Sequence, residues 1–198
     1  MMLDSRGQSI AGPALLLLLF SLMMSSCNLG GNSGLDEANQ LDQSAGEDIR
    51  EIERLVRENK NKEVEVTRAR NAGDYDTARR LMDASVQAID RGLEKAQSAA
   101  GKLDKASRLD VSSTIKEYLS LRTQSANKAI EALRELRRGV IAYREGTGST
   151  EKAVIEKSKN ETQQALEKYE ELITESDSLQ RQADEIARRN PDTIKPGR

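Results

Sequence analysis

The chain has 198 residues, of which 36% are hydrophobic, 32% are charged and only 3% are aromatic, and its formal net charge at pH 7 is −2. Its length corresponds to one domain, and a composition rich in charge but poor in aromatic side chains is typical of long packed helices rather than a thick globular core. The nearly balanced charge argues against the strongly basic surface that nucleic-acid-binding proteins use, so no nucleic acid is expected as a partner.

The N-terminal stretch combines an apolar run with the only cysteine of the chain. Residues 14–24 are almost entirely apolar, and Ser25, Ser26 and Cys27 follow directly. The run has the length of the hydrophobic region of a secretory signal, and it is shorter than the about 20 apolar residues that a membrane-spanning helix needs. The sequence from Met24 to Cys27 resembles the lipobox of bacterial lipoproteins.

This resemblance implies that residues 1–26 form a signal peptide, that cleavage falls between Ser26 and Cys27, and that Cys27 is acylated, for example with palmitate. Two or more acyl chains suffice for stable anchoring, so the membrane is the expected partner through the N-terminal lipid. Asn28 follows the cysteine, and the sorting of such lipoproteins implies that this residue favours the outer membrane over the inner membrane. The periplasmic face of the outer membrane is the expected location rather than the cell surface. An ordinary cleaved signal beside an unrelated cysteine is the alternative.

Residues 27–46 contain several Gly, Asn and Ser residues and little apolar periodicity, which predicts a flexible tether between the lipid and the folded domain. The first helix is expected at residues 47–72, with Gly73 as its stop signal. Its apolar stripe is interrupted at Asn59 and Glu63, so this helix should be the most loosely packed.

Three further helices are expected at residues 75–109, 114–145 and 151–190. In each of them apolar residues recur at alternating intervals of four and three, the spacing of a coiled-coil seam. The last helix has hydroxyl residues at several seam positions, and Pro191 should end it, because a proline disfavours the helical conformation of the residue before it. Residues 191–198 are predicted to form a disordered tail.

Short connections make consecutive helices antiparallel neighbours. The sequence therefore predicts an all-α fold, an antiparallel bundle of three to four long helices with coiled-coil-like packing over residues 47–190. A coiled coil of the last three helices alone is the alternative. Arg122 is a polar member of the seam, and its stem is expected to lie along apolar surface while its head reaches water. The predicted seam consists of Ile89, Leu93, Leu119, Leu133, Leu136, Leu172 and Leu179, and the last four of these are expected to be buried.

The turn between the first two expected helices has a recognisable pattern. Gly73, Tyr75 and Ala78 resemble the Gly-x-Tyr-x-x-Ala turn that joins the two helices of a tetratricopeptide repeat. No second copy follows at the repeat period of about 34 residues, so we interpret the segment as a simple turn of a helix hairpin.

Side chains that carry catalysis or bind transition metals are scarce. The chain has no His, and Cys27 is its only cysteine, so neither a His-based nucleophile site nor a Glu-x-x-His di-iron motif is present. Carboxylate pairs such as Glu170-Glu171 and arginine pairs such as Arg137-Arg138 are interpreted as solvated helix faces. We expect no catalytic residue, no metal site and no cofactor.

Three functions are compatible with a lipid-anchored helical bundle. The first is a non-enzymatic cell-envelope protein that binds another protein through a helix face, or acts as a scaffold or assembly factor. The second is a carrier of a hydrophobic or envelope lipid ligand, for which the hydroxyl-rich last seam would leave an imperfect core. The third is a surface-exposed protein that binds a host. A large apolar cavity would favour the carrier, whereas a solid core with an exposed apolar stripe would favour the partner binder.

Overall fold

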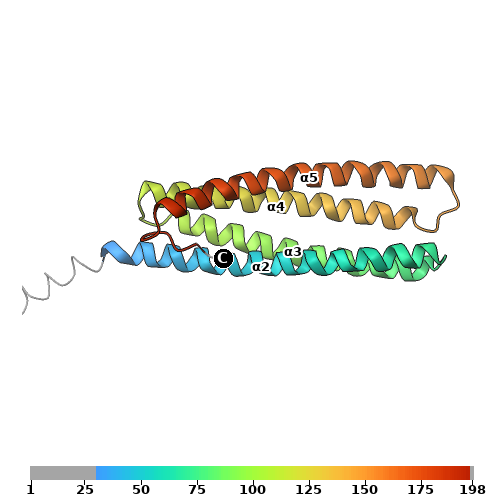
Figure 1. The fold of residues 1–198 in the computed structure, drawn as a ribbon, viewed down its shortest axis with the longest axis horizontal. Coiled ribbons are helices and arrows are strands. Elements are labelled where there is room, and N and C mark those ends of the chain that lie inside the picture. Colours follow the sequence, from blue (N-terminus) through green and yellow to red (C-terminus); the bar gives the residue numbers. More distant parts are fainter. Residues whose placement is uncertain (1–29, 197–198) are drawn as a thin grey trace, which may run out of the picture.

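The computed structural model describes the backbone of residues 30–196, with side chains from residue 34 onward. This part of the chain forms four long helices and no strand, namely α2 (Gly30–Asn71), α3 (Tyr75–Ser107), α4 (Ser113–Gly146) and α5 (Lys152–Arg189). Figure 1 shows the helices side by side along their length, with α2 and α5 at opposite edges. The predicted all-α helical bundle is confirmed.

Local capping fixes where α3 and α4 begin. The Asp74 carboxylate accepts a hydrogen bond from the Thr77 amide at 3.0 Å, and Gly73 takes a φ of 76°, which L side chains rarely adopt. At the start of α4 the Ser112 hydroxyl accepts a hydrogen bond from the Ile115 amide at 3.4 Å. Because these connections are short, consecutive helices run antiparallel.

The two ends of the bundle carry different connections. The distal end consists of the α2–α3 turn at residues 72–74 and the α4–α5 turn at residues 147–151, and the proximal end consists of the start of α2, the α3–α4 turn and the end of α5 (Figure 1). The α4–α5 turn contacts the start of α3, because the Arg79 guanidinium donates two hydrogen bonds to the Thr147 carbonyl at 2.7 and 3.0 Å.

The main apolar cluster extends from the proximal end to the middle of the bundle. Its largest buried side chains are Leu103 of α3 with Tyr118 and Leu119 of α4, and much of the remainder is alanine. Alanine lets neighbouring helices approach closely. A smaller cluster around Val66 and Met82 lies toward the distal end.

The start of α2 differs from the sequence prediction. A tether is predicted over residues 27–46, but residues 30–46 are already helical. Ala38, Asp42 and Ala45 are buried, and they are spaced by four and three residues as in the other seams. The prediction is therefore wrong for this part of the chain, because alanine and aspartate at seam positions give almost no hydropathy signal.

The segment after α5 is packed rather than disordered over residues 191–196. Ile194 is only 3% exposed and belongs to the main apolar cluster. The Asn39 side chain of α2 donates a hydrogen bond to the Thr193 carbonyl at 3.2 Å and accepts one from the Lys195 amide at 3.3 Å. The predicted disordered tail is corrected for these residues, because a single apolar side chain and one amide hold them to the bundle.

Hydroxyl residues in the α5 seam join α5 tightly to α4. Ser158 donates a hydrogen bond to the Ala142 carbonyl at 2.7 Å, and Ser176 donates one to the Ser125 carbonyl at 3.0 Å. A Cβ atom at Gly146 would lie only 2.6 Å from the Ser158 Cβ, so glycine permits this close approach. The hydroxyls therefore do not leave this interface imperfect, because backbone carbonyls of α4 accept their protons.

Candidate functional site: an apolar groove between α2 and α5

A groove lies along one face of the bundle, between α2 and α5. The helices pack in chain order, α2 on α3, α3 on α4 and α4 on α5, whereas α2 and α5 do not pack closely together. The groove has a volume of about 640 Å³, which lies within the range of about 300–1,000 Å³ found for small-molecule sites. Helices α3 and α4 form its floor, and α2 and α5 form its walls.

Most side chains that line the groove are apolar. They include Ile52, Leu55, Val56 and Val66 of α2, Met82 and Ile89 of α3, Leu133, Leu136 and Val140 of α4, and Leu166 and Tyr169 of α5. Leu133 is only 3% exposed, whereas Val56 and Leu166 are 37% and 40% exposed. The groove therefore has a buried apolar floor and an apolar rim that reaches solvent.

Two polar residues of α2 disfavour close packing of α2 against α5 along the groove. Asn59 and Glu63 interrupt the apolar stripe of α2, and both line the groove. The Oδ1 atom of Asn59 is buried, and no hydrogen-bond partner for it is found among the described residues, which costs free energy. An apolar pair at these positions would favour closure of α2 onto α5, so Asn59 and Glu63 favour an open groove.

A buried ion pair joins α2 to α4 on the proximal side of the groove. The Arg122 Nη1 atom lies 2.9 Å from Asp42 Oδ1, and the Tyr118 hydroxyl donates a hydrogen bond to Asp42 Oδ2 at 2.8 Å. Arg122 Nη1 also donates to the Tyr118 hydroxyl at 2.9 Å. Arg122 is only 3% exposed, so its head does not reach water as the sequence suggests, because Asp42 provides a buried counter-charge.

The protonation states in this ion pair follow from its surroundings. Burial acts to lower the pKa of Arg122, but the negative charge of Asp42, the hydroxyl of Tyr118 and the charge of Asp184 together outweigh burial and raise the pKa above its ordinary value. Burial also raises the pKa of the Tyr118 hydroxyl, which therefore stays protonated as a donor to Asp42. Helices α2 and α4 are thus held together by a charged and hydrogen-bonded contact.

A second contact between α2 and α4 lies on the distal side of the groove. The Arg70 guanidinium is 4.8 Å from the centroid of the Tyr143 ring and donates a hydrogen bond to its hydroxyl. Such cation–π contacts stabilise the pairing of the two side chains. Because Tyr143 also lines the groove, contacts between α2 and α4 bound the groove on both sides.

Asp48 ties the proximal half of α2 to α3. Its carboxylate accepts hydrogen bonds from Lys102 at 2.5 Å, Ser98 at 2.7 Å and Lys95 at 3.2 Å. Burial acts to raise the pKa of Asp48, but these three hydrogen bonds together outweigh it and hold the pKa below its ordinary value. With the Asp42 pair, this contact holds α2 in place on the proximal side of the groove.

The predicted seam residues divide between the core and the groove. Ile89, Leu119, Leu133 and Leu172 are buried, whereas Leu93, Leu136 and Leu179 are only partly buried. Ile89, Leu133 and Leu136 also line the groove. Leu136 is more exposed than the sequence suggests because it faces this open space, and nothing in the structure explains the partial exposure of Leu179.

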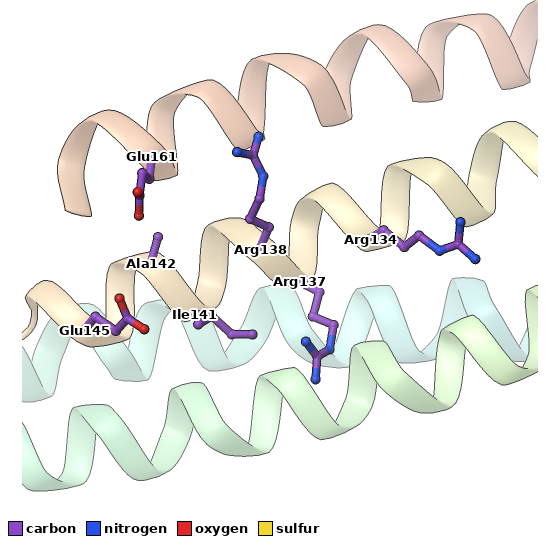
Figure 2. A pocket seen from close by; sticks show the side chains of 7 residues that line it. All are labelled: Arg134, Arg137, Arg138, Ile141, Ala142, Glu145 and Glu161. Atoms are coloured by element: carbon purple, nitrogen blue, oxygen red, sulfur yellow. The ribbon is translucent and has the colours of Figure 1, made fainter. Parts of the chain in front are cut away.

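A second, smaller hollow of about 400 Å³ is lined by Arg134, Arg137 and Arg138 of α4 together with side chains of both α4 and α5. Figure 2 shows that the three guanidinium groups point in different directions, with Arg138 directed toward α5 and Arg137 away from it. Arg137 pairs with Asp90 at 2.6 Å and Arg138 with Glu135 at 2.7 Å. The arginines therefore do not converge on a shared anion.

The cleavage and lipidation residues, Ser26 and Cys27, lie outside the described residues, as does the rest of the expected signal peptide. Among the residues that are described, no helix is long and apolar enough to cross a membrane. In the same part of the chain, no group of three or more His, Cys, Asp or Glu side chains is placed to hold a metal ion.

Comparison of the chain with known protein families, with curated proteins and with solved structures finds no match. Function is therefore inferred from the groove and from the N-terminal sequence.

Proposed function

We propose that this chain is a lipid-anchored, non-enzymatic binding protein of the cell envelope, and that the groove between α2 and α5 is its binding site. The groove is the main support for the proposal, because it is an apolar opening along one face of an otherwise closely packed bundle. A protein that acted only as a spacer would need the packed helices but not an apolar groove. Anchoring through Cys27 and location at the outer membrane, favoured by Asn28, are further parts of the proposal, with the periplasmic face as the proposed side.

The dimensions of the groove favour a carrier of a hydrophobic ligand over a scaffold. Its volume is that of a small-molecule site. A protein partner is the second candidate, and the exposed apolar residues Val56 and Leu166 at the rim support it, since contiguous apolar surface marks interaction sites.

Lipid anchoring predicts that Cys27→Ser abolishes acylation, because the thioether to the lipid forms on the cysteine sulfur. In cells fed an alkyne fatty acid, the wild-type protein should carry the label, and Cys27→Ser should remain an unprocessed or soluble chain without it. Equal labelling of the two proteins would contradict anchoring at this residue.

Binding in the groove predicts site-specific crosslinking. A photo-reactive amino acid at position 166 should crosslink an apolar ligand or partner in intact membranes, because Leu166 lines the groove. The same amino acid at position 155 is the matched control, since Ile155 is on the same helix and is similarly exposed, at 44% against 40%, but does not line the groove. Identical products from both positions, or none from either, would refute the groove as the binding site.

A further inference from the structure

We infer that the groove holds the hydrocarbon chain of a single-chain amphiphile such as a long-chain fatty acid. This inference rests on the proposed function, since it names the ligand class of the same groove. The groove is elongated along the helices: it runs over residues 52–67 of α2, 82–92 of α3, 133–143 of α4 and 162–170 of α5. At the α-helical rise of about 1.5 Å per residue, these spans correspond to lengths of about 12–22 Å.

The opening between α2 and α5 suits a narrow ligand. The groove of about 640 Å³ is bounded by these two helices, which do not pack closely together. An α-helix with its side chains is about 10–12 Å across, whereas a polymethylene chain is one carbon atom wide. Such a chain can therefore lie along the apolar floor without any movement of α2 or α5.

The lining also suits a hydrocarbon chain. Ile89, Leu133 and Val140 on the floor are fully apolar side chains, so burial of a chain against them is favourable along its whole length. Lys60 and Glu63 of α2 and Glu170 of α5 line the groove but are exposed. Lys60 is the one of these three that would attract the carboxylate of a fatty acid, while the chain occupies the floor.

The expected acyl chains on Cys27 are too far away to fill the groove. Residues 30–52 of α2 span about 33 Å, whereas one acyl chain covers half of the about 30 Å hydrocarbon core of a bilayer. Residues 27–29 would add only about 10 Å if fully extended. The occupant is therefore a separate molecule rather than the anchor of the same chain.

The absence of tryptophan from the sequence allows a direct test. Leu166→Trp places a single tryptophan at the rim of the groove, and Ile155→Trp places one at a similarly exposed position of α5 outside it. The probe is a brominated long-chain fatty acid, kept below its micelle-forming concentration, which quenches tryptophan on contact. The protein is the chain of residues 28–198, which includes all described helices and contacts.

The expected result is saturable quenching of Leu166→Trp at one fatty acid per protein and no saturable quenching of Ile155→Trp. Affinity should rise about three- to fourfold for each methylene added within the groove and level off once the chain outgrows it. Val56→Glu, which puts a charge on the rim, should weaken binding by about tenfold or more. Val64→Glu is the matched control on the same helix, since Val64 is 62% exposed and does not line the groove, and it should leave affinity unchanged.

Absence of quenching in Leu166→Trp, equal quenching in both tryptophan variants, or affinity independent of chain length would each overturn the inference. The results that would contradict the proposed function differ from those that would contradict the ligand class. If the brominated acid does not bind but a photo-reactive residue at position 166 still crosslinks a protein, the groove is a binding site for a protein and only the ligand class is wrong. If both experiments are negative, the proposed function fails as well.

Discussion

Asp42→Ala should lower the free energy of unfolding by about 3–5 kcal/mol, because it removes one partner of a buried ion pair and leaves the other charge uncompensated. Arg122 would keep its charge at a site that is 3% exposed, and the Tyr118 hydroxyl would lose its acceptor. Domains have about 5–15 kcal/mol of stability in total. A loss of this size should lower the melting temperature by roughly 6–20 °C for a chain of this length.

Thermal unfolding of residues 28–198 measures this effect. Asp36→Ala, at an exposed position of the same helix, should change stability by no more than about 0.5 kcal/mol. Replacing all three members, Asp42→Leu with Arg122→Met and Tyr118→Phe, should cost little or even stabilise the bundle, because neither a charge nor an unpaired hydroxyl then remains buried. Arg122 Nε already lacks a hydrogen-bond partner in the described structure. If Asp42→Ala and Asp36→Ala melt alike, the ion pair does not hold α2 to α4.

The last three helices could be predicted from the sequence because their signals are local. The observed bounds of α3, α4 and α5 lie within two residues of the predicted ones. A capping aspartate at position 74, a capping serine at position 112 and Pro191 mark these ends, and the spacing of apolar residues by four and three supplies the interior. Each of these signals lies within the helix it concerns or directly beside its ends.

The first part of α2 could not be predicted in the same way, because its signal depends on distant residues. Asp42 occupies a seam position that is stable only because Arg122 and Tyr118 lie opposite it on α4. Likewise, Ile194 is packed because it joins the main apolar cluster and because Asn39 of α2 holds the residues on either side of it. A single sequence does not reveal either pairing, so both segments read as polar and unstructured.

The sequence indicates some features of the groove but does not predict the groove itself. The interruption of the α2 stripe at Asn59 and Glu63 indicates loose packing, and Leu133 and Leu136 are predicted seam residues that form part of the floor. The sequence does not reveal how far apart α2 and α5 lie. That distance is set by contacts far apart in the chain: the hydroxyl bonds that hold α5 to α4 and the ion pair that holds α2 to α4.

Three alanine substitutions on α4 should separate the core from the groove. Leu119→Ala should cost about 2–5 kcal/mol, because Leu119 is 1% exposed and its truncation leaves a closed cavity. Leu136→Ala should cost less, because Leu136 lines the groove and its truncation only widens an existing opening. Glu117→Ala, at an exposed position, should stay within about 0.5 kcal/mol.

The comparison is controlled because all three variants introduce the best helix former into the same helix, so differences in melting temperature report packing alone. Equal melting of Leu119→Ala and Glu117→Ala would remove Leu119 from the core. A cost for Leu136→Ala as large as that for Leu119→Ala would have a different meaning. It would show that Leu136 is enclosed in solution, hence that α2 and α5 close over the floor when no ligand is bound, and that a ligand must first separate the two helices to enter.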